Sequence, residues 1–424
     1  AQAIASLRAE TPWRTAGDCH STILKRGSSQ EDMFKALFII WGQVALCRRF
    51  TVPLSRQIVP VKVKGRTVSH KTAYYGSIFV GHPRPQNFTV VFDTGSGHLF
   101  LPDRSCEDQV CLQHRRFDRA LSESAKEISG DGRHASSEHD VVSISYGIGE
   151  VVGDFIRDVV CIGSPKEAEG SQPLCTSARV ILAGHLTSEP FQHFAFDGVL
   201  GLGLKALALN PEFHLFSQLA KSAPMQQTFS VFLSRPGAPG SQVTFGGQDE
   251  ARAQGATSWV PVSLREQGYW AVRIQAVRAG SKALPLCEDG GCHAIVDTGT
   301  SLLGVPQQGM SWMLAATARR AGHSTDCQQV PGPRLSFELE GGAVVELNAE
   351  EFSRPLPTEV TSSSTGKVHS VCRALLLPVE MPAIGDKVFL FGEPVLQKYY
   401  TAFDAKDFRV GFALAKHRQE ALVV

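Results

Sequence analysis

Two aspartates in this sequence each follow an apolar run and begin the same short pattern. Asp93 follows residues 90–92 (Val-Val-Phe), and Asp297 follows residues 294–296 (Ala-Ile-Val). Both aspartates are followed by Thr-Gly and then by a hydroxyl residue. The apolar runs predict buried strands, and an unpaired charge at the end of such a strand is costly. One Asp-Thr-Gly indicates little more than a turn, but two copies in the same context predict a site built from both.

If the two segments face each other, their carboxyl groups share one site. Two such groups cannot both ionise readily, so they hold one proton between them. The carboxylate can then take a proton from a water molecule, while the carboxylic acid donates one to a carbonyl oxygen. This chemistry hydrolyses an amide without a metal, a cofactor or a covalent intermediate.

The residues after each aspartate have types suited to holding a carboxyl group in place. These supporting residues are Thr94, Gly95 and Ser96 in the first copy and Thr298, Gly299 and Thr300 in the second. We expect each threonine hydroxyl to bond the backbone of the opposite segment. We expect the glycines to allow a tight turn and the close approach of another chain. The final hydroxyl of each set can bond an outer carboxylate oxygen.

A third segment suits a mobile lid over such a site. Tyr146 is followed by Gly147 and Gly149 in a short apolar stretch that predicts a hairpin. A tyrosine on a glycine-flanked hairpin can close over a substrate and exclude water. The competing interpretation is a tyrosine packed in an ordinary hairpin.

The two Asp-Thr-Gly segments resemble the catalytic loops of the pepsin-like aspartic proteases (peptidase family A1), for which a shared proton is the established chemistry. Further segments that resemble this family are residues 73–78, 144–149, 196–203, 259–262 and 389–392. The resemblance extends from about Tyr74 to Lys416. It implies an all-β, bilobal fold in which two pseudo-twofold-related lobes enclose a substrate cleft. It also implies that Asp93 and Asp297 are catalytic and that Tyr146, Gly147 and Gly149 belong to the flap.

The sequence departs from the pepsin pattern just after the first aspartate. Gly97, His98 and Phe100 stand where the family usually has Ser, Asn and Trp. The tryptophan normally donates its indole N–H to the flap tyrosine, and a phenylalanine cannot donate a hydrogen bond. We therefore expect the flap to be held differently. We also expect Tyr146, Phe100 and Leu303 to form walls of the substrate pocket.

Length and composition agree with a two-lobed soluble protein. The chain has 424 residues, a formal net charge of +1 and 43% hydrophobic residues, which favours neither nucleic acid nor a polyanionic partner. Abundant glycine and proline with few amphipathic segments favour an all-β chain. The predicted domains are an extension at 1–72, an N-terminal lobe at 73–245, a C-terminal lobe at 246–416 and a tail at 417–424. Residues 306–320 nevertheless have helical periodicity and end in two arginines, as a helix C-terminus often does.

Ten cysteines suit an oxidising compartment. The resemblance implies the disulfides Cys106–Cys111, Cys287–Cys292 and Cys327–Cys372. Cys161 and Cys175 are left to pair with each other across a polar loop, which is an addition to the pepsin pattern. An alternative for the first pair is a zinc site with His114.

The N-terminal region contains a pattern typical of a signal peptide. Residues 33–47 begin with Met33 and a basic residue, continue as a short apolar run and end near Cys47. The run is too short to span a membrane. The alternative is a buried element of an N-terminal extension, in which Cys19 can pair with Cys47. Residues 51–54 resemble the first strand of a family prosegment, but the interval before Tyr74 is short for a complete one.

Together these features predict an aspartic endopeptidase that acts in acid and prefers apolar residues around the scissile bond. We expect a monomer that binds polypeptides in extended form, without nucleic acid or a transmembrane segment. We expect it in the secretory pathway, either secreted or in an acidic vesicle, vacuole or lysosome-like compartment, with a glycosylation sequon at Asn87. One alternative is a binding protein without turnover, which would usually have lost an Asp, Thr or Gly of the two segments. The other is a metal hydrolase, but no His-Glu-x-x-His pattern is present.

Overall fold

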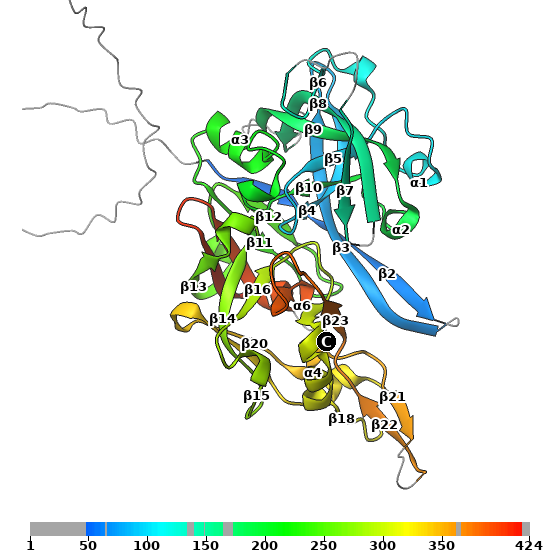
Figure 1. Ribbon diagram of the computed structural model, residues 1–424, viewed down its shortest axis with the longest axis vertical. Coiled ribbons are helices and arrows are strands. Elements are labelled where there is room, and N and C mark those ends of the chain that lie inside the picture. The colour runs from blue at the N-terminus through cyan, green and yellow to red at the C-terminus, as the bar shows by residue number, and fades with distance from the viewer. Residues whose placement is uncertain are drawn as a thin grey trace, which may run out of the picture.

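The computed structural model describes residues 48–63, 66–133, 140–147, 149–163, 173–361 and 366–417, with the backbone alone of residues 62–63 and 66–69 (Figure 1). The predicted signal peptide at 33–47 and both Cys19 and Cys47 therefore lie outside the described residues. The described chain is mostly β-sheet, as predicted, and its strands form two large sheets and one small one.

A nine-stranded sheet forms the upper lobe in Figure 1, with the strand order β2-β3-β4-β10-β5-β9-β8-β6 and with β7 paired to β8. Its strands are β2 (Ser55–Val63), β3 (Arg66–Val80), β4 (Gln86–Asp93), β5 (Leu99–Pro102), β6 (Lys126–Ile128), β7 (Val142–Tyr146), β8 (Gly149–Ile162), β9 (Leu174–Leu186) and β10 (Gly198–Gly201).

A fourteen-stranded sheet continues from the junction of the lobes into the lower lobe, with the order β1-β12-β11-β25-β26-β13-β14-β16-β24-β17-β23. These strands are β1 (Phe50–Pro53), β11 (Thr228–Phe232), β12 (Gln242–Phe245), β13 (Ala253–Ser263), β14 (Ala271–Ala279), β16 (Cys292–Val296), β17 (Leu303–Pro306), β23 (Leu376–Val379), β24 (Val388–Phe391), β25 (Tyr399–Asp404) and β26 (Arg409–Ala415). Beside this path lie β15 (Lys282–Ala283), β19 (Leu335–Leu339) and β20 (Val344–Leu347). The small sheet contains β18 (Arg319–Arg320), β21 (Thr358–Thr361) and β22 (Val368–Cys372).

The two lobes repeat one arrangement around the two aspartates. In the upper lobe β10 pairs in parallel with β4 and antiparallel with β5, and β5 pairs in parallel with β9. In the lower lobe β24 pairs in parallel with β16 and antiparallel with β17, and β17 pairs in parallel with β23. The strands β4 and β16, which lead to the two aspartates, therefore occupy equivalent places.

Glycine is required at the ends of β10 and β24, where each strand meets the loop that follows one of the aspartates. A Cβ on Gly201 would lie 2.4 Å from the His98 nitrogen, and one on Gly392 would lie 2.4 Å from the Thr300 oxygen. Such distances are far below a normal contact, so only glycine lets the backbones approach this closely.

Helices are short throughout the described chain. They are α1 (Gln109–Leu112), α2 (Ser188–Phe191), α3 (Leu215–Ser222), α4 (Met310–Thr317), α5 (Ala349–Phe352) and α6 (Glu393–Lys398). None of these helices has the length and apolar character that a membrane crossing requires.

The helix predicted for residues 306–320 is wrong at both ends. Residues 303–306 belong to β17, α4 ends at Thr317, and Arg319 and Arg320 pair with β22. The Arg319 guanidinium donates to the carbonyl oxygens of Val330 and Cys327. The pairing with β22, a strand distant in sequence, replaces the expected helix C-terminus, so tertiary packing overrides the local pattern.

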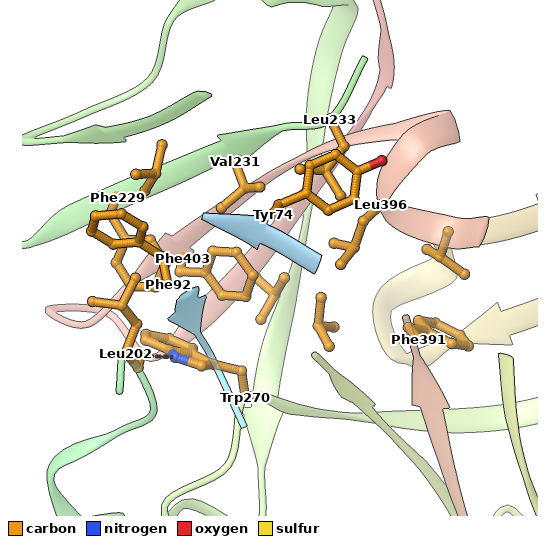
Figure 2. Close-up of a cluster of buried hydrophobic side chains, with 14 of the residues drawn as sticks. Tyr74, Phe92, Leu202, Phe229, Val231, Leu233, Trp270, Phe391, Leu396 and Phe403 are labelled. Carbon is orange, nitrogen blue, oxygen red and sulfur yellow. Dashed lines mark hydrogen bonds between the residues drawn. The ribbon is translucent and has the colours of Figure 1, made fainter. Parts of the chain in front are cut away.

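Aromatic side chains fill the junction between the lobes (Figure 2). The rings of Phe229 and Phe403 stack at 4.7 Å between centroids, and Trp270 packs edge-on against both. The indole N–H of Trp270 donates to the Leu202 carbonyl oxygen over 2.8 Å. Each fully buried ring contributes roughly 1.5–3 kcal/mol, so this cluster holds the two repeats together.

The described residues contain four disulfides, and they are the four predicted pairs: Cys106–Cys111, Cys161–Cys175, Cys287–Cys292 and Cys327–Cys372. Cys161 and Cys175 lie opposite each other in β8 and β9. Because Cys106 is bonded to Cys111, neither sulfur is a thiolate that can bind zinc, and the alternative zinc site with His114 is wrong.

Candidate active site

In each Asp-Thr-Gly segment, the aspartate carboxyl group accepts a hydrogen bond from the backbone of its own loop. Asp93 is the last residue of β4, and Asp297 directly follows β16. The Gly95 N–H donates to Asp93 Oδ1 over 2.9 Å, and the Gly299 N–H donates to Asp297 Oδ1 over 2.8 Å. The two carboxyl groups therefore have the same local geometry, as the repeated sequence predicts.

The two carboxyl groups also face each other across the junction of the lobes. A Cβ on Gly95 would lie 2.8 Å from Asp297 Oδ1, and one on Gly299 would lie 2.5 Å from Asp93 Oδ1. Each carboxyl group thus lies against the glycine of the opposite loop, in space that any other residue would fill. Glycine at the third position is consequently what allows the carboxyl groups to share one site.

Two threonines lock the loops together in the way expected from the sequence. The Thr94 hydroxyl donates to the Val296 carbonyl oxygen over 2.7 Å, and the Thr298 hydroxyl donates to the Phe92 carbonyl oxygen over 2.6 Å. Each hydroxyl also accepts the backbone N–H of the other threonine. Thr94 is fully buried, so these hydrogen bonds are protected from water and fix the separation of the aspartates.

The hydroxyls after the glycines behave differently in the two loops. Thr300 donates its hydroxyl to Asp297 Oδ2, as predicted. The Ser96 hydroxyl is buried beside Asp93 and acts to lower the pKa of that carboxyl group, but it makes no hydrogen bond of good geometry to the described residues.

The electrostatics of the pair favour one shared proton. Burial, and then the nearby charge of Asp297, raise the pKa of Asp93 from 3.8 to about 7. The Ser96 hydroxyl and the Gly95 N–H oppose this shift without cancelling it. One proton therefore stays on the pair up to about neutral pH.

The predicted flap is the β7–β8 hairpin, with Tyr146 at the end of β7. Gly147 has φ +60°, which favours glycine. A Cβ on Gly149 would lie 2.6 Å from Pro190, so Gly149 lets the hairpin pack against the segment around α2. The Ile148 position lies outside the described residues.

Tyr146 packs against the residue that replaces the usual tryptophan. Its ring lies 5.0 Å from that of Phe100, and its buried hydroxyl has no hydrogen-bond partner among the described residues. Burial and then the charge of Asp93 raise the pKa of Tyr146, while the Ser96 hydroxyl acts to lower it, so the Tyr146 hydroxyl lies near both Ser96 and the dyad. Phe100 holds the ring, but it leaves the hydroxyl unbound.

The expected pocket walls at Leu303 and Phe100 are both wrong, because each side chain is almost completely buried in the core of its lobe. Leu303 is fully buried in β17, between β23 and β24. It therefore packs in the core of the lower lobe and cannot contact a substrate in an open cleft.

Tyr269 is a site residue that the sequence reasoning missed. Burial, then Asp297 and then Asp93 raise its pKa, so it lies within reach of both carboxyl groups. The Gly268 carbonyl oxygen before it accepts the Leu204 N–H over 2.7 Å, and Trp270 after it bonds Leu202. Two contacts between the lobes thus hold Tyr269 in place. Its position next to the conspicuous Trp270 was the only sequence signal.

The sequence also did not predict that two buried histidines, His98 and His214, lie together behind the loop that contains Asp93. His98 Nε2 accepts the Leu209 N–H over 2.8 Å. His214 Nε2 donates to the Gly203 carbonyl oxygen over 2.6 Å, and the Gly203 N–H donates to the Ser96 carbonyl oxygen. Burial lowers the pKa of both histidines to about 4. Both rings are therefore neutral in weak acid, and they support the loop that contains Asp93.

Comparisons with known proteins agree with this geometry. The family model described as eukaryotic aspartyl protease matches residues 73–415. Gastricsin from Homo sapiens is 32% identical over 354 residues, which cover 81% of this chain and 81% of that protein. Cathepsin E-A from Xenopus laevis is 33% identical over 350 residues, with 80% and 79% covered. Embryonic pepsinogen from Gallus gallus is 31% identical over 351 residues, with 81% and 80% covered.

The chain therefore belongs to the eukaryotic aspartyl protease family, with the pepsin-like bilobal fold. It is an aspartic endopeptidase, a hydrolase that acts on polypeptides.

Proposed function

We propose that Asp93 and Asp297 hydrolyse the peptide bond by activating a water molecule held between them. The observation that carries this proposal is that each carboxyl group lies against the glycine of the opposite loop. Asp93, with the raised pKa, holds the proton. Asp297 accepts hydrogen bonds from Gly299 and Thr300, which orient its carboxyl group.

In the first step the water oxygen attacks the carbonyl carbon. Asp297 takes a proton from the water, and Asp93 gives its proton to the carbonyl oxygen, so that a gem-diol forms. In the second step Asp297 gives its proton to the amide nitrogen, the C–N bond breaks, and Asp93 recovers a proton from a gem-diol hydroxyl. The pair ends with one proton, as it began.

The same pair sets an acidic working range. Hydrolysis needs the shared proton, and the raised pKa of Asp93 keeps it there up to about pH 7. Activity therefore falls as pH rises through neutrality. The buried histidines, with pKa values of about 4, set the lower end of the range.

The substrate is a polypeptide in extended form with apolar residues at the scissile bond. The aromatic rings of Tyr146 and Tyr269 lie beside the dyad and support this preference. Tyr146, Gly147 and Gly149 form the flap that closes over the substrate.

The catalytic unit is a monomer with an N-terminal lobe at 73–245 and a C-terminal lobe at 246–416. Each lobe supplies one aspartate from the same chain, so the site is complete without a second copy. Residues 1–72 precede this unit as an extension, and residues 417–424 follow it as a tail.

We place the enzyme in the secretory pathway, either secreted or in an acidic vesicle, vacuole or lysosome-like compartment. Four disulfides suit an oxidising environment. Asn87 is exposed on β4 and begins an Asn-Phe-Thr sequon, which makes it accessible for glycosylation.

The test is cleavage of a fluorogenic peptide with an apolar scissile pair, measured from pH 3 to 8. Asp93→Asn and Asp297→Asn should each abolish cleavage, while Asp131→Asn, which changes an exposed carboxyl group, should leave it intact. Equal activity in the wild type and both dyad variants would refute this mechanism. A folded wild type that binds the peptide without cleaving it would favour a binding protein.

A further inference from the structure

A groove of about 680 Å³ lies between the β2–β3 hairpin and the C-terminal lobe, and Ser301 and Leu302, just after the second Asp-Thr-Gly segment, line one end of it. One wall contains Arg56, Ile58, His70 and Thr72 of the hairpin. The opposite wall comes from Ser301 and Leu302, from α5 and α6, and from the end of β26. Figure 1 shows the hairpin extending from the upper lobe past α2.

The hairpin is fastened firmly to the C-terminal lobe. Glu393, at the start of α6, accepts hydrogen bonds from the Arg56 guanidinium over 2.7 Å and from the Tyr74 hydroxyl over 2.8 Å. The Ser301 hydroxyl accepts the Thr72 N–H and donates to the Thr72 carbonyl oxygen, each over 2.8 Å. In Figure 2, Tyr74 lies next to Leu396 of α6. The groove is thus a built feature with fixed walls.

The hairpin is also fastened to the segment that supports the flap. The Gln57 side chain donates to the His193 carbonyl oxygen and accepts the Ala195 N–H. Lys71 lies 3.5 Å from Glu189, against which the flap residue Gly149 packs. The hairpin therefore spans from the flap side of the cleft to the C-terminal lobe.

One edge of β3 is free where it meets this groove. Before Tyr75, no described strand other than β2 pairs with β3. Thr72 directs its N–H and carbonyl oxygen away from β2, toward Ser301. Backbone groups alternate in direction along a strand, so those of His70 point the same way. Pro60, which lies opposite His70 and has no N–H, agrees with this register.

The edge of β3 that no strand covers begins near the first Asp-Thr-Gly segment. Its first outward-facing residue, Thr72, is bonded to Ser301, so its free backbone groups begin at His70. β4 pairs with β3 from Tyr75 and ends at Asp93, so the unpaired part of β3 starts where the catalytic loop begins. Ser301, which closes the groove at this end, directly follows Thr300, the residue bonded to Asp297. The groove consequently begins next to the loop that contains Asp297.

We propose that this groove binds the part of the polypeptide substrate that leaves the cleft at this end. The bound segment pairs its backbone with the free edge of β3 at His70, as an added strand. Its apolar side chains contact Ile58 and Leu414, which are 48% and 45% exposed on opposite sides of the groove. This inference rests on the proposed function, because it needs a substrate held in the cleft.

The charges of the groove favour an apolar segment over a strongly charged one. Arg56 is paired with Glu393 and Lys398 is paired with Glu351. The remaining lining groups include Glu350, Arg235 and two histidines, so neither sign of charge dominates. Backbone hydrogen bonds and apolar contact are left to supply the affinity.

The test compares a short fluorogenic peptide, with three residues on each side of the scissile bond, with two longer peptides. Each longer peptide adds five residues, mainly valine and leucine, at one end only. We expect one extension to raise kcat/KM of the wild type about tenfold and the other to have little effect. If neither extension changes kcat/KM, the proposal is wrong.

The variants separate the two contributions of the groove to binding, which are backbone hydrogen bonds to β3 and apolar contact. His70→Pro removes the N–H that points into the groove without removing a bond to β2, and His70→Ala is the matched control that keeps this N–H. Ile58→Asp places a charge on the apolar wall, and Leu356→Asp changes a residue that is 62% exposed outside the groove.

His70→Pro and Ile58→Asp should each remove most of the gain from the longer peptide and leave the short peptide unaffected. Equal losses of kcat/KM on the short and the longer peptide would overturn the proposal. Effects of His70→Ala and Leu356→Asp equal to those of His70→Pro and Ile58→Asp would also overturn it. No cleavage of the short peptide by the wild type would instead count against the proposed function itself.

Discussion

Thr94 and Thr298 exchange hydrogen bonds across the junction of the lobes, the N–H of each donating to the hydroxyl oxygen of the other over 2.9 and 3.0 Å. Each hydroxyl then donates to a carbonyl oxygen of the opposite strand. The two loops therefore form one rigid unit, although they lie far apart in the sequence. The position of each carboxyl group depends on both lobes.

Replacing Thr94 with valine should weaken both the fold and catalysis. The change keeps the side-chain shape but leaves the Val296 carbonyl oxygen and the Thr298 N–H without their partner. At about 1–3 kcal/mol for each of these two buried groups, we expect the free energy of unfolding to fall by roughly 2–6 kcal/mol. A small displacement of the aspartates should also lower kcat by about 10–100-fold. Denaturant unfolding and peptide cleavage measure these effects, and Thr94→Ser, which keeps the hydroxyl, should restore most of both.

Replacing Thr300 with valine should lower catalysis. The Thr300 hydroxyl donates to Asp297 Oδ2, so the change removes a hydrogen bond that orients this carboxyl group, and we expect kcat to fall about 10-fold. Thr300→Ser keeps the donor and should retain most of the activity. Peptide cleavage at a single acidic pH measures the effect, and an unchanged kcat in Thr300→Val would show that the hydroxyl does not position Asp297.

The raised pKa of Asp93 should also appear in the stability of the fold. Between pH 3.8 and about 7 the folded protein holds a proton that the unfolded chain has lost. Stability from this group is therefore present in acid and declines as pH rises toward 7. Asp93→Asn removes this dependence, so its stability relative to the wild type should increase from pH 5 to pH 8. Urea unfolding at both pH values checks the direction.

The buried histidines should make the protein less stable in strong acid. Their pKa values fall from 6.5 unfolded to about 4 folded, so the unfolded chain binds protons first as pH drops. At about 1.4 kcal/mol per pH unit, each histidine then lowers the stability by up to roughly 3 kcal/mol between pH 6.5 and 4. His98→Gln can still accept the Leu209 N–H without a titrating ring and should reduce this loss. Melting temperatures from pH 3 to 7 test it, and parallel curves for both proteins would contradict it.

Tyr146→Phe should cost little stability, because the hydroxyl that it removes is buried without a partner. The expected change in the free energy of unfolding is below about 0.5 kcal/mol, since the ring contact with Phe100 remains. Tyr146→Ala removes that contact and should lower kcat/KM by about 10–100-fold through loss of the lid. A large loss of stability in Tyr146→Phe would reveal a hydrogen bond to the hydroxyl that the structure does not show.

The pair of facing carboxyl groups could be predicted because both belong to the same short segment, which occurs twice in the sequence. Asp93 and Asp297 each follow an apolar strand, and the Thr-Gly that follows has only a few structural uses. The four disulfides were predicted with the help of the family resemblance. Leu303 was misplaced because a leucine beside a catalytic loop can face either the cleft or the core, and the sequence alone does not distinguish them.

The sequence by itself determined the two carboxyl groups, the hydroxyls and glycines that hold them, and the repeated strand pattern that brings them together. Only the tertiary structure placed Tyr269 near both aspartates, paired His98 and His214 behind the first loop, and ended α4 at Thr317. It also revealed the groove under the β2–β3 hairpin. These features depend on contacts between residues distant in the chain. Those contacts decide which groups are buried, and so have shifted pKa values, and which strand edges stay exposed. No local sequence pattern records either outcome.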